Sequence, residues 1–254
     1  MTFSGAVLRN KLAEAGRPAE MMPVLTDSWL RQFSPDNGYW HKDRGLRLST
    51  IERYRLCIDH VEHQAIIPVY WQGSLRGVIR RQLRPWKQPK YKFPRHLPRR
   101  ELLWGYDQAK AQQAVQLRGA FGRRPVMLCE GQIDAMAGSE CGIPTVALGG
   151  NFMTREQRAW LMKLAPTAVI VGLDNDSNGI GHDVIAATRT EDEKPPTGVF
   201  RVGAMIRDLP VFVVDWGQYK DPAEVRNVAK RTALVHEAKR FRDWKRVAIS
   251  SLLM

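Results

Sequence analysis

The sequence predicts an α/β protein built on a parallel sheet, and three observations carry that prediction. In the second half of the chain, short β-branched apolar runs alternate with longer amphipathic stretches. Strands that alternate with helices in this way form parallel sheets with helices on both faces. The first half lacks the alternation and contains two adjacent β-rich runs, together with the excess of positive charge. We therefore expect a parallel sheet with helices on both faces, preceded by a basic, mixed α+β subdomain.

The second half has four expected strands, at residues 125–129, 143–148, 167–173 and 210–216. The expected helices are at residues 132–141, 154–164, 179–189 and 221–244. Thr154 stands where a helix N-cap residue belongs. Because ligands bind at the carboxyl ends of strands in such sheets, the residues that follow each strand are the first candidates for a site.

The first half is predicted to be a smaller α+β unit. Residues 65–71 and 76–83 are β-rich and flank a Gln-Gly-Ser turn, which predicts a hairpin. Helices are expected within residues 26–33, 48–57 and 102–117. Glycines and charges at 119–124 suggest a domain boundary, so we expect three parts, at residues 1–121, 122–220 and 221–254.

The excess positive charge lies in the first half. The formal net charge is +13; residues 1–124 hold 23 Lys/Arg and 10 Asp/Glu, and the rest of the chain holds 16 of each. Residues 76–100 hold ten basic side chains and no acid, which is typical of a surface that binds nucleic acid. Trp86, Tyr91 and Phe93 lie in this stretch and can stack on unpaired bases. The alternative is a solvated basic face whose aromatic rings lie in the core.

Neither a membrane span nor a zinc site is expected. The sequence has no apolar run of about 18 residues, and its N-terminus has too short an apolar stretch for a secretion signal. Cys57, Cys129 and Cys141 stand far apart, without the paired spacing of a zinc site. These features predict a cytoplasmic protein with no zinc in this chain.

Acidic side chains follow three of the expected strands. Because the carboxyl ends of parallel strands lie along one edge of a sheet, these carboxylates come together and repel one another unless a cation lies between them. Oxygen ligands of this kind favour Mg²⁺ or Mn²⁺. The residues are Glu130 and Asp134 after the first strand, Asp174 and Asp176 after the third, and Asp221 and Glu224 after the fourth.

The stretch DNDSNG at 174–179 also resembles the start of an EF-hand calcium loop. Position 12 of that loop should be a bidentate Glu, but it is Ile185 here, and the segment that precedes the loop is predicted to be a strand. A phosphate-binding loop is excluded because its glycine-lysine motif is absent. The remaining alternative, surface acids with Asp176 or Ser177 as a helix cap, does not explain Glu130 and Asp134 after another strand.

These motifs resemble the TOPRIM domain shared by primases, topoisomerases and some nucleases. VMLCEGQIDAMAGSECGIPTVALGG and TAVIVGLDNDSNG carry its signature, an E-G pair after the first strand and D-x-D after the third. HKDRGLRLSTIERYRL, IIPVYWQGSLRGVIRRQL, PKYKF and RRELLWGYDQAK are similar, in order, to the basic subdomain that precedes TOPRIM in bacterial DnaG-type primases and phage primase–helicases. KDPAE resembles the acidic segment after their fourth strand, and the likeness covers about residues 39–230.

The resemblance implies the RNA polymerase core of a DNA primase, a nucleotidyltransferase that makes short RNA primers on single-stranded DNA. The parts would be a basic primase subdomain (1–121), a TOPRIM Rossmann-like catalytic domain (122–220) and a helical tail (221–254). Catalytic roles are implied for Glu130, Asp134, Asp174 and Asp176. Mg²⁺ or Mn²⁺ would be held by Asp174, Asp176, Asp221, Glu130 and Glu224. Template and nucleotide phosphates would be bound by Arg44, Arg81, Lys90 and Arg99, with Arg80 and Lys92 beside two of them.

The implied partners are a single-stranded DNA template and ribonucleoside triphosphates, with a replicative helicase or a separate zinc-bearing subunit as further candidates. The zinc-binding and helicase domains of the family are not found in this chain, which favours a phage, plasmid or mobile-element primase core in a bacterial cell. Ala223 stands where the family often has a second acid, so one metal site is weaker or uses Glu224. The alternatives are a TOPRIM nuclease and a non-catalytic accessory protein that binds single-stranded DNA.

Overall fold

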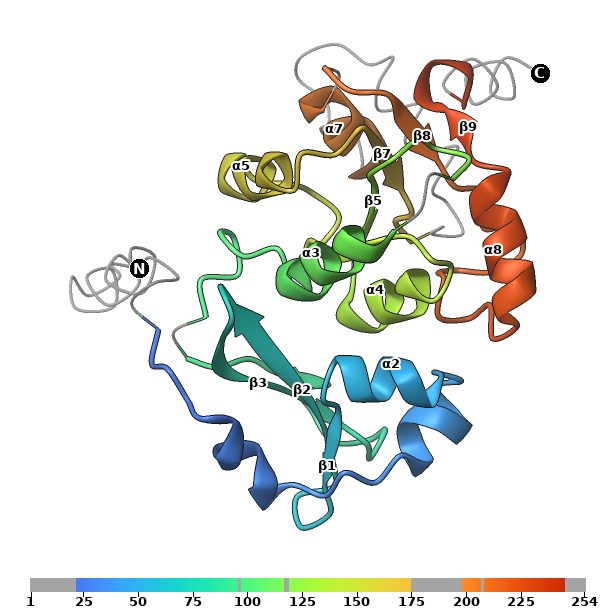
Figure 1. Ribbon diagram of the computed structural model, residues 1–254. Helices are drawn as coiled ribbons and strands as arrows, with labels where there is room; N and C mark the ends of the chain where they lie inside the picture. The colour runs from blue at the N-terminus through green and yellow to red at the C-terminus, as the bar shows by residue number, and fades with distance from the viewer. Residues whose placement is uncertain (1–21, 96, 117–118, 175–197, 207, 245–254) are drawn as a thin grey trace, which may run out of the picture.

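The structure, a computed structural model, describes residues 22–95, 97–116, 119–174, 198–206 and 208–244. These residues form a four-stranded antiparallel sheet of order β1-β2-β3-β4 and a five-stranded sheet of order β6-β5-β7-β8-β9. Figure 1 shows the antiparallel sheet in the lower half of the view and the other sheet in the upper half, with α2, α3 and α4 between them. The predicted fold class, a parallel-rich α/β sheet preceded by an α+β unit, is confirmed.

The antiparallel sheet contains the predicted hairpin. Its strands are β1 (Cys57–Asp59), β2 (Gln64–Trp71), β3 (Ser74–Gln82) and β4 (Tyr91–Lys92). Gln72 and Gly73, with φ of 52° and 76°, join β2 to β3. Positive φ at both central residues gives a turn whose twist matches that of the paired strands. Strand β3 therefore runs back along β2 and carries the basic stretch away from the turn.

Both faces of the antiparallel sheet are covered. Ile66 of β2 packs in a small cluster with Leu30 and Phe33, whereas its neighbour Ile67 joins the main core. This alternation follows from the two-residue period of a strand. The helical segments of this half are the 3₁₀-helix η2 (Asp27–Gln32), the π-helix η3 (Gly38–Asp43), α2 (Leu48–Arg53) and α3 (Tyr106–Val115).

The second sheet brings three strand ends to one edge. Its strands are β5 (Pro125–Cys129), β6 (Thr145–Ala147), β7 (Ala168–Val171), β8 (Val211–Val213) and β9 (Lys239–Arg240). The first four are parallel, and β9 joins the edge antiparallel to β8. Leu128 pairs with Val171, which pairs with Val213, so β5, β7 and β8 end side by side.

The helices of the second half are α4 (Gln132–Ser139), α5 (Arg155–Lys163), α7 (Gly198–Met205) and α8 (Val228–His236). Thr154 caps α5 as predicted: its hydroxyl accepts from Gln157 N, and the Gln157 side chain accepts from Thr154 N. This reciprocal capping box satisfies backbone donors at the helix start. None of the described helices is long and apolar enough to cross a membrane. The helix predicted at 179–189 lies outside the described residues.

The prediction of continuous helix over 221–244 is wrong. The Asn227 side chain accepts from Lys230 N and starts α8 at Val228. The carbonyls of Pro222 and Val225 accept from the Arg231 side chain, so a loop precedes the helix. After α8 the chain pairs with the edge of β8 as β9. Tertiary contacts of this kind override local helix propensity.

One hydrophobic core extends through both halves of the chain. Trp104 links them: its backbone pairs with that of Ala147, the last residue of β6, and its indole N–H donates to Pro68 O of β2. Tyr54 stacks on the Trp104 ring with centroids 5.2 Å apart. The basic subdomain is therefore packed against the edge of the parallel sheet, and this packing forms the walls of a cleft.

Candidate functional site

A cleft of about 780 Å³ is lined by residues from both halves of the chain. Except for Asp176, which lies outside the described residues, and Arg80 and Lys92, every residue predicted for the site lines it. We call the predicted carboxylates of the cleft the acidic set: Glu130, Asp134, Asp174, Asp221 and Glu224. We call five of its cations the basic set: the predicted Arg44, Arg81, Lys90 and Arg99, together with Lys220, which the sequence did not single out. Asp43 and Arg226 also line the cleft and belong to neither set.

The strand ends place the acidic set. Glu130 directly follows β5, and its carbonyl accepts from Gly149 N, which follows β6. Asp174 follows β7, and Asp134 lies in the first turn of α4. The loop from β8 to α8 supplies Asp221 and Glu224. This agrees with the rule that ligand sites form at the carboxyl ends of parallel strands.

Gly131 makes room for the Asp134 carboxylate. A Cβ atom placed on Gly131 would lie 2.5 Å from Asp134 Oδ2, closer than real contacts allow. A hydrogen bond from the Gly131 backbone also favours the charged form of Asp134. The E-G pair of the sequence therefore has a local reason: the glycine lets the Asp134 carboxylate, in the first turn of α4, fold back against the backbone of Gly131. The motif identified this pair, but the contact with Asp134 could not be read from it.

The carboxylates of the acidic set interact electrostatically. Burial raises the pKa of Asp134 to about 7, with further contributions from the negative charges of Asp221 and Asp174. The nearby Arg44 guanidinium opposes the shift. Acids that disfavour one another's ionisation form a site with affinity for a cation. Among the residues that the structure describes, no three His, Cys, Asp or Glu side chains are grouped closely enough to hold a metal ion by themselves.

Hydrogen bonds within the β8–α8 loop order its acids. Glu224 N donates to Asp221 Oδ1 at 2.9 Å, and Lys220 N donates to Glu224 Oε2 at 2.8 Å. The Lys220 side chain reaches across the cleft to Asp174, with 3.1 Å between Nζ and Oδ2. Sequence reasoning missed Lys220 because no local pattern indicates which strand end a loop lysine will reach.

Aromatic rings orient two cations of the basic set. Arg81 lies over the Tyr91 ring, 5.0 Å from its centroid, and donates to the Tyr91 hydroxyl. Arg99 lies 4.0 Å from the centroid of Phe93 and donates to Gly149 O at 3.2 Å. Tyr91 and Phe93 are thus half-buried supports for cations. Guanidinium groups held in this way need less ordering when an anion binds.

The cations are close enough to affect one another. The positive charge of Arg81 lowers the pKa of Lys90, with burial and the charges of Arg44 and Lys220 acting in the same direction. A second hollow of about 380 Å³ shares Arg44, Arg81 and Lys90 with the cleft and continues to Lys87. Crowded cations beside an open groove form a binding surface for phosphates.

Arg80 and Lys92 do not line the cleft. Because side chains alternate along β3, Arg80 points to the face opposite to Arg81. There it forms an ion pair with Asp59 at 3.0 Å and lies over the Phe33 ring. The Lys92 side chain is exposed on β4. Of the three aromatic residues in the basic stretch, Trp86 is the most exposed, at 78%.

The comparisons with known proteins agree with this fold. Residues 127–225 match the family model described as Toprim-like. The chain is similar to a DnaG primase catalytic domain solved bound to ssDNA, with 17% identity and a TM-score of 0.62 over 98% of this chain and 84% of that one. None of the curated proteins matches the sequence significantly.

Two further solved structures share the fold. The RNA polymerase domain of Mycobacterium tuberculosis primase DnaG is 20% identical, with a TM-score of 0.52 over 99% of this chain and 85% of that one. The primase fragment of the bacteriophage T7 primase-helicase protein is 15% identical, with a TM-score of 0.52 over 88% and 81%. The chain therefore combines a Toprim-like segment with the fold of a primase catalytic domain.

Proposed function

We propose that this chain, with its Toprim-like segment in a primase catalytic fold, is the RNA polymerase core of a DNA primase. The observation that carries the proposal is the cleft itself, in which carboxylates from three strand ends face a set of oriented cations. Nucleotidyl transfer needs both: carboxylates to hold divalent metal, and cations to hold template and triphosphate. The substrates would be ribonucleoside triphosphates on single-stranded DNA.

The acidic set fits a divalent metal by its chemistry, because it offers carboxylate oxygens whose mutual repulsion a cation relieves. Asp174 and Asp176 would hold Mg²⁺ or Mn²⁺, with Asp134 and Asp221 completing the site and Glu130 as a ligand or base. When bound, the metal would neutralise the triphosphate and activate the attacking 3′-hydroxyl.

The basic set would hold nucleic acid by its phosphates. Arg81 and Arg99, oriented by their ring contacts, present guanidinium groups to the cleft. Arg44 and Lys90 extend the positive surface into the neighbouring hollow. Contacts with phosphates position a strand without reading its sequence, as a template site requires.

Ala223 lines the cleft between Asp221 and Glu224. One oxygen of Glu224 already accepts from Lys220 N. If Glu224 acts as a ligand, it uses its other oxygen or exchanges this bond. We therefore assign the metal first to Asp174, Asp176 and Asp221, with Glu224 as a weaker contributor.

A primer-synthesis assay tests the proposal. The protein is incubated with single-stranded DNA, labelled ribonucleotides and Mg²⁺ or Mn²⁺, and we expect short oligomers that disappear with Asp174→Ala. Glu156→Ala, exposed on α5, is the matched control and should leave synthesis unchanged. Template shortening would instead indicate a nuclease, and DNA binding with neither reaction would indicate an accessory protein.

A second substrate separates loss of initiation from loss of catalysis. A template with a pre-annealed RNA primer bypasses initiation, for which a separate zinc-bearing subunit or a helicase would be needed. We expect the wild-type protein to extend this primer even where it starts none. Failure to extend it with either metal would refute the primase proposal.

A further inference from the structure

A buried ion pair lies beside the cleft. Glu140, at the C-terminal end of α4, and Arg231, on α8, have side chains only 1% and 2% exposed, and Arg231 Nη2 donates to Glu140 Oε2 at 2.6 Å. Neither residue lines the cleft. The proposed chemistry therefore leaves this pair without a role.

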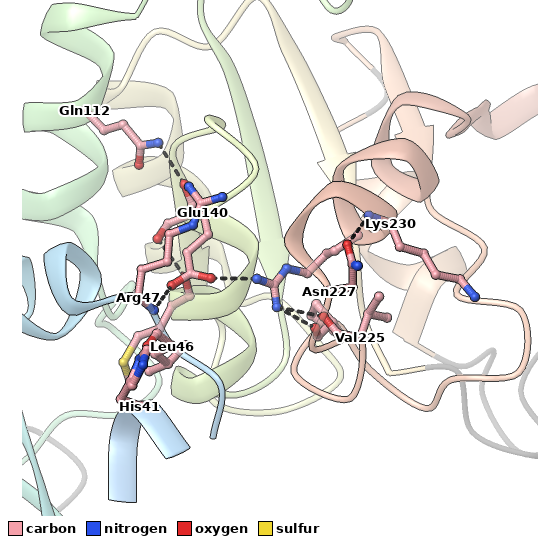
Figure 2. Close-up of polar contacts among 12 residues, drawn as sticks. His41, Leu46, Arg47, Gln112, Glu140, Val225, Asn227 and Lys230 are labelled. Carbon is pink, nitrogen blue, oxygen red and sulfur yellow. Dashed lines mark hydrogen bonds and ion pairs between the residues drawn. The ribbon is translucent and has the colours of Figure 1, made fainter. Parts of the chain in front are cut away.

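The second carboxylate oxygen of Glu140 contacts the basic subdomain. Oε1 accepts from Arg47 N at 2.7 Å, and Figure 2 shows Glu140 between Arg47 and the loop that contains Val225. Arg47 lies three residues after Arg44, a member of the basic set. Glu140 thus connects the segment that carries Arg44 with the loop that carries part of the acidic set.

Arg231 holds that loop by its backbone. Its Nη1 donates to Pro222 O at 3.2 Å and to Val225 O at 3.1 Å. These two carbonyls flank Ala223 and Glu224, and Asp221 directly precedes them. Because a guanidinium group is planar and rigid, the bonds that Arg231 makes to Glu140 and to the loop fix the position of the loop relative to Glu140.

The same loop is also held by the residue that follows Val225. Arg226 Nη2 donates to Asp43 O at 3.0 Å, and Asp43 directly precedes Arg44. The loop that bears Asp221 is therefore linked to the basic subdomain twice, through Arg226 and through Arg231 with Glu140.

Stability alone does not account for a buried ion pair, because apolar side chains of similar volume often replace one at no loss of stability. Apolar side chains, however, cannot supply hydrogen bonds, which have a fixed direction. We propose that Glu140 and Arg231 are positioning residues that place the Asp221–Glu224 loop against Asp134 and Asp174, and thereby set the affinity of the cleft for divalent metal. The inference rests on the proposed function only in its assignment of metal to the acidic set.

The test uses a double variant that separates positioning from stability. Glu140→Met/Arg231→Met fills the buried space with apolar side chains and removes every directed bond of the pair. Arg158→Met is the matched control, because Arg158 also bonds a carbonyl, that of Met205, and a carboxylate, that of Asp208, away from the cleft. The measurements are the unfolding temperature, hydrogen exchange of residues 217–227 without metal, and Mn²⁺ affinity by titration.

We expect the double variant to keep the unfolding temperature of the wild type or exceed it, to exchange faster at 217–227 and to bind Mn²⁺ at least about tenfold more weakly. Arg158→Met should retain wild-type exchange at 217–227 and wild-type Mn²⁺ affinity. If the double variant does not fold, Glu140→Gln tests the inference with the same three measurements. Its side chain has one acceptor oxygen in place of two, so it cannot accept from Arg47 and Arg231 through separate oxygens.

A folded variant with wild-type exchange and wild-type Mn²⁺ affinity would overturn the inference. A wild-type protein that binds no Mn²⁺ would overturn it as well. If the wild type binds Mn²⁺ but extends no primer, the primase proposal fails alone, because the exchange and affinity measurements involve neither nucleotides nor DNA.

Discussion

The Lys220 ammonium group lies 3.1 Å from the Asp174 carboxylate, so a lysine of the β8–α8 loop neutralises a strand-end acid inside the cleft. The Asp174 side chain is 13% exposed and that of Lys220 is 52% exposed. A divalent cation that binds Asp174 would be repelled by the ammonium group. Lys220 and a bound metal would therefore compete for the same carboxylate.

The first prediction concerns this competition. We expect Lys220→Gln to bind Mn²⁺ about fivefold more tightly, equivalent to about 1 kcal/mol, because a half-exposed ion pair contributes no more than this. A Mn²⁺ titration measures the change. Lys110→Gln, an exposed residue of α3, is the control and should leave the affinity unchanged. Weaker binding by Lys220→Gln would show that Lys220 assists the metal.

The second prediction concerns pH. The pKa of Asp134 is raised from 3.8 to about 7 in the folded protein, first by burial and then by Asp221 and Asp174. Between these two pH values the folded state keeps the Asp134 proton, whereas the unfolded state releases it. Protonated Asp134 therefore contributes its full stabilisation to the folded state below about pH 4, and this contribution is lost as the pH rises through about 7.

Asp134→Asn removes the titration and provides the reference. Without metal, the free energy of unfolding of the wild type, relative to this variant, should fall by up to about 4 kcal/mol between pH 4 and pH 8. Urea unfolding at each pH measures it. Added Mg²⁺ at pH 8 should stabilise the wild type more than the variant. A difference that is constant with pH would contradict the raised pKa.

The parallel sheet and the hairpin could be predicted because their signals are local. β5 and β7 are β-branched or apolar along their length and buried throughout, and Thr154 with Gln157 forms a capping box within four residues. The strand-end acids followed from the same alternation, because parallel strands bring their carboxyl ends to one edge. The acidic edge of the cleft was thus expected from local patterns and a rule of topology, whereas its cations were expected from the family resemblance.

The parts that could not be predicted depend on contacts distant in sequence. Lys220 pairs with Asp174 only once the β8–α8 loop is packed beside the end of β7, and Arg231 pairs with Glu140 only once α8 is packed beside α4. The C-terminal helix was predicted to be too long for the same reason. It is interrupted by β9, which forms only by pairing with β8. Arg80 is different: the alternation of β3 already implied that it and Arg81 face opposite sides.

The third prediction compares Arg80 with Arg81. Arg81→Gln removes a cation of the cleft, so we expect weaker binding of oligothymidylate and a fall of about 0.7 in the slope of log affinity against log salt concentration. Arg80→Gln loses its ion pair with Asp59 on the other face and should lower stability without changing the slope. Binding isotherms at several salt concentrations measure both. Equal effects on the slope would mean that the strand passes over both faces of β3.

The fourth prediction concerns Trp86, which is 78% exposed in the basic stretch. An exposed indole beside Lys87 and Arg84 can stack on an unpaired base. We expect Trp86→Ala to weaken oligothymidylate binding by about 1–3 kcal/mol, Trp86→Phe to retain most of the affinity, and both to unfold like the wild type. Because the chain has eight tryptophans, quenching by DNA is read as the difference between the wild type and Trp86→Phe.

The alternative for Trp86 is a solvated loop residue without contact to DNA. It predicts equal affinities for the wild type, Trp86→Ala and Trp86→Phe, and no difference in quenching. The salt dependence of binding also distinguishes base stacking by Trp86 from an effect on the neighbouring cations. Stacking is an uncharged contact, so Trp86→Ala should lower affinity at every salt concentration while keeping the slope that Arg81→Gln reduces. A loss of slope with Trp86→Ala would indicate instead that the loop positions the neighbouring cations.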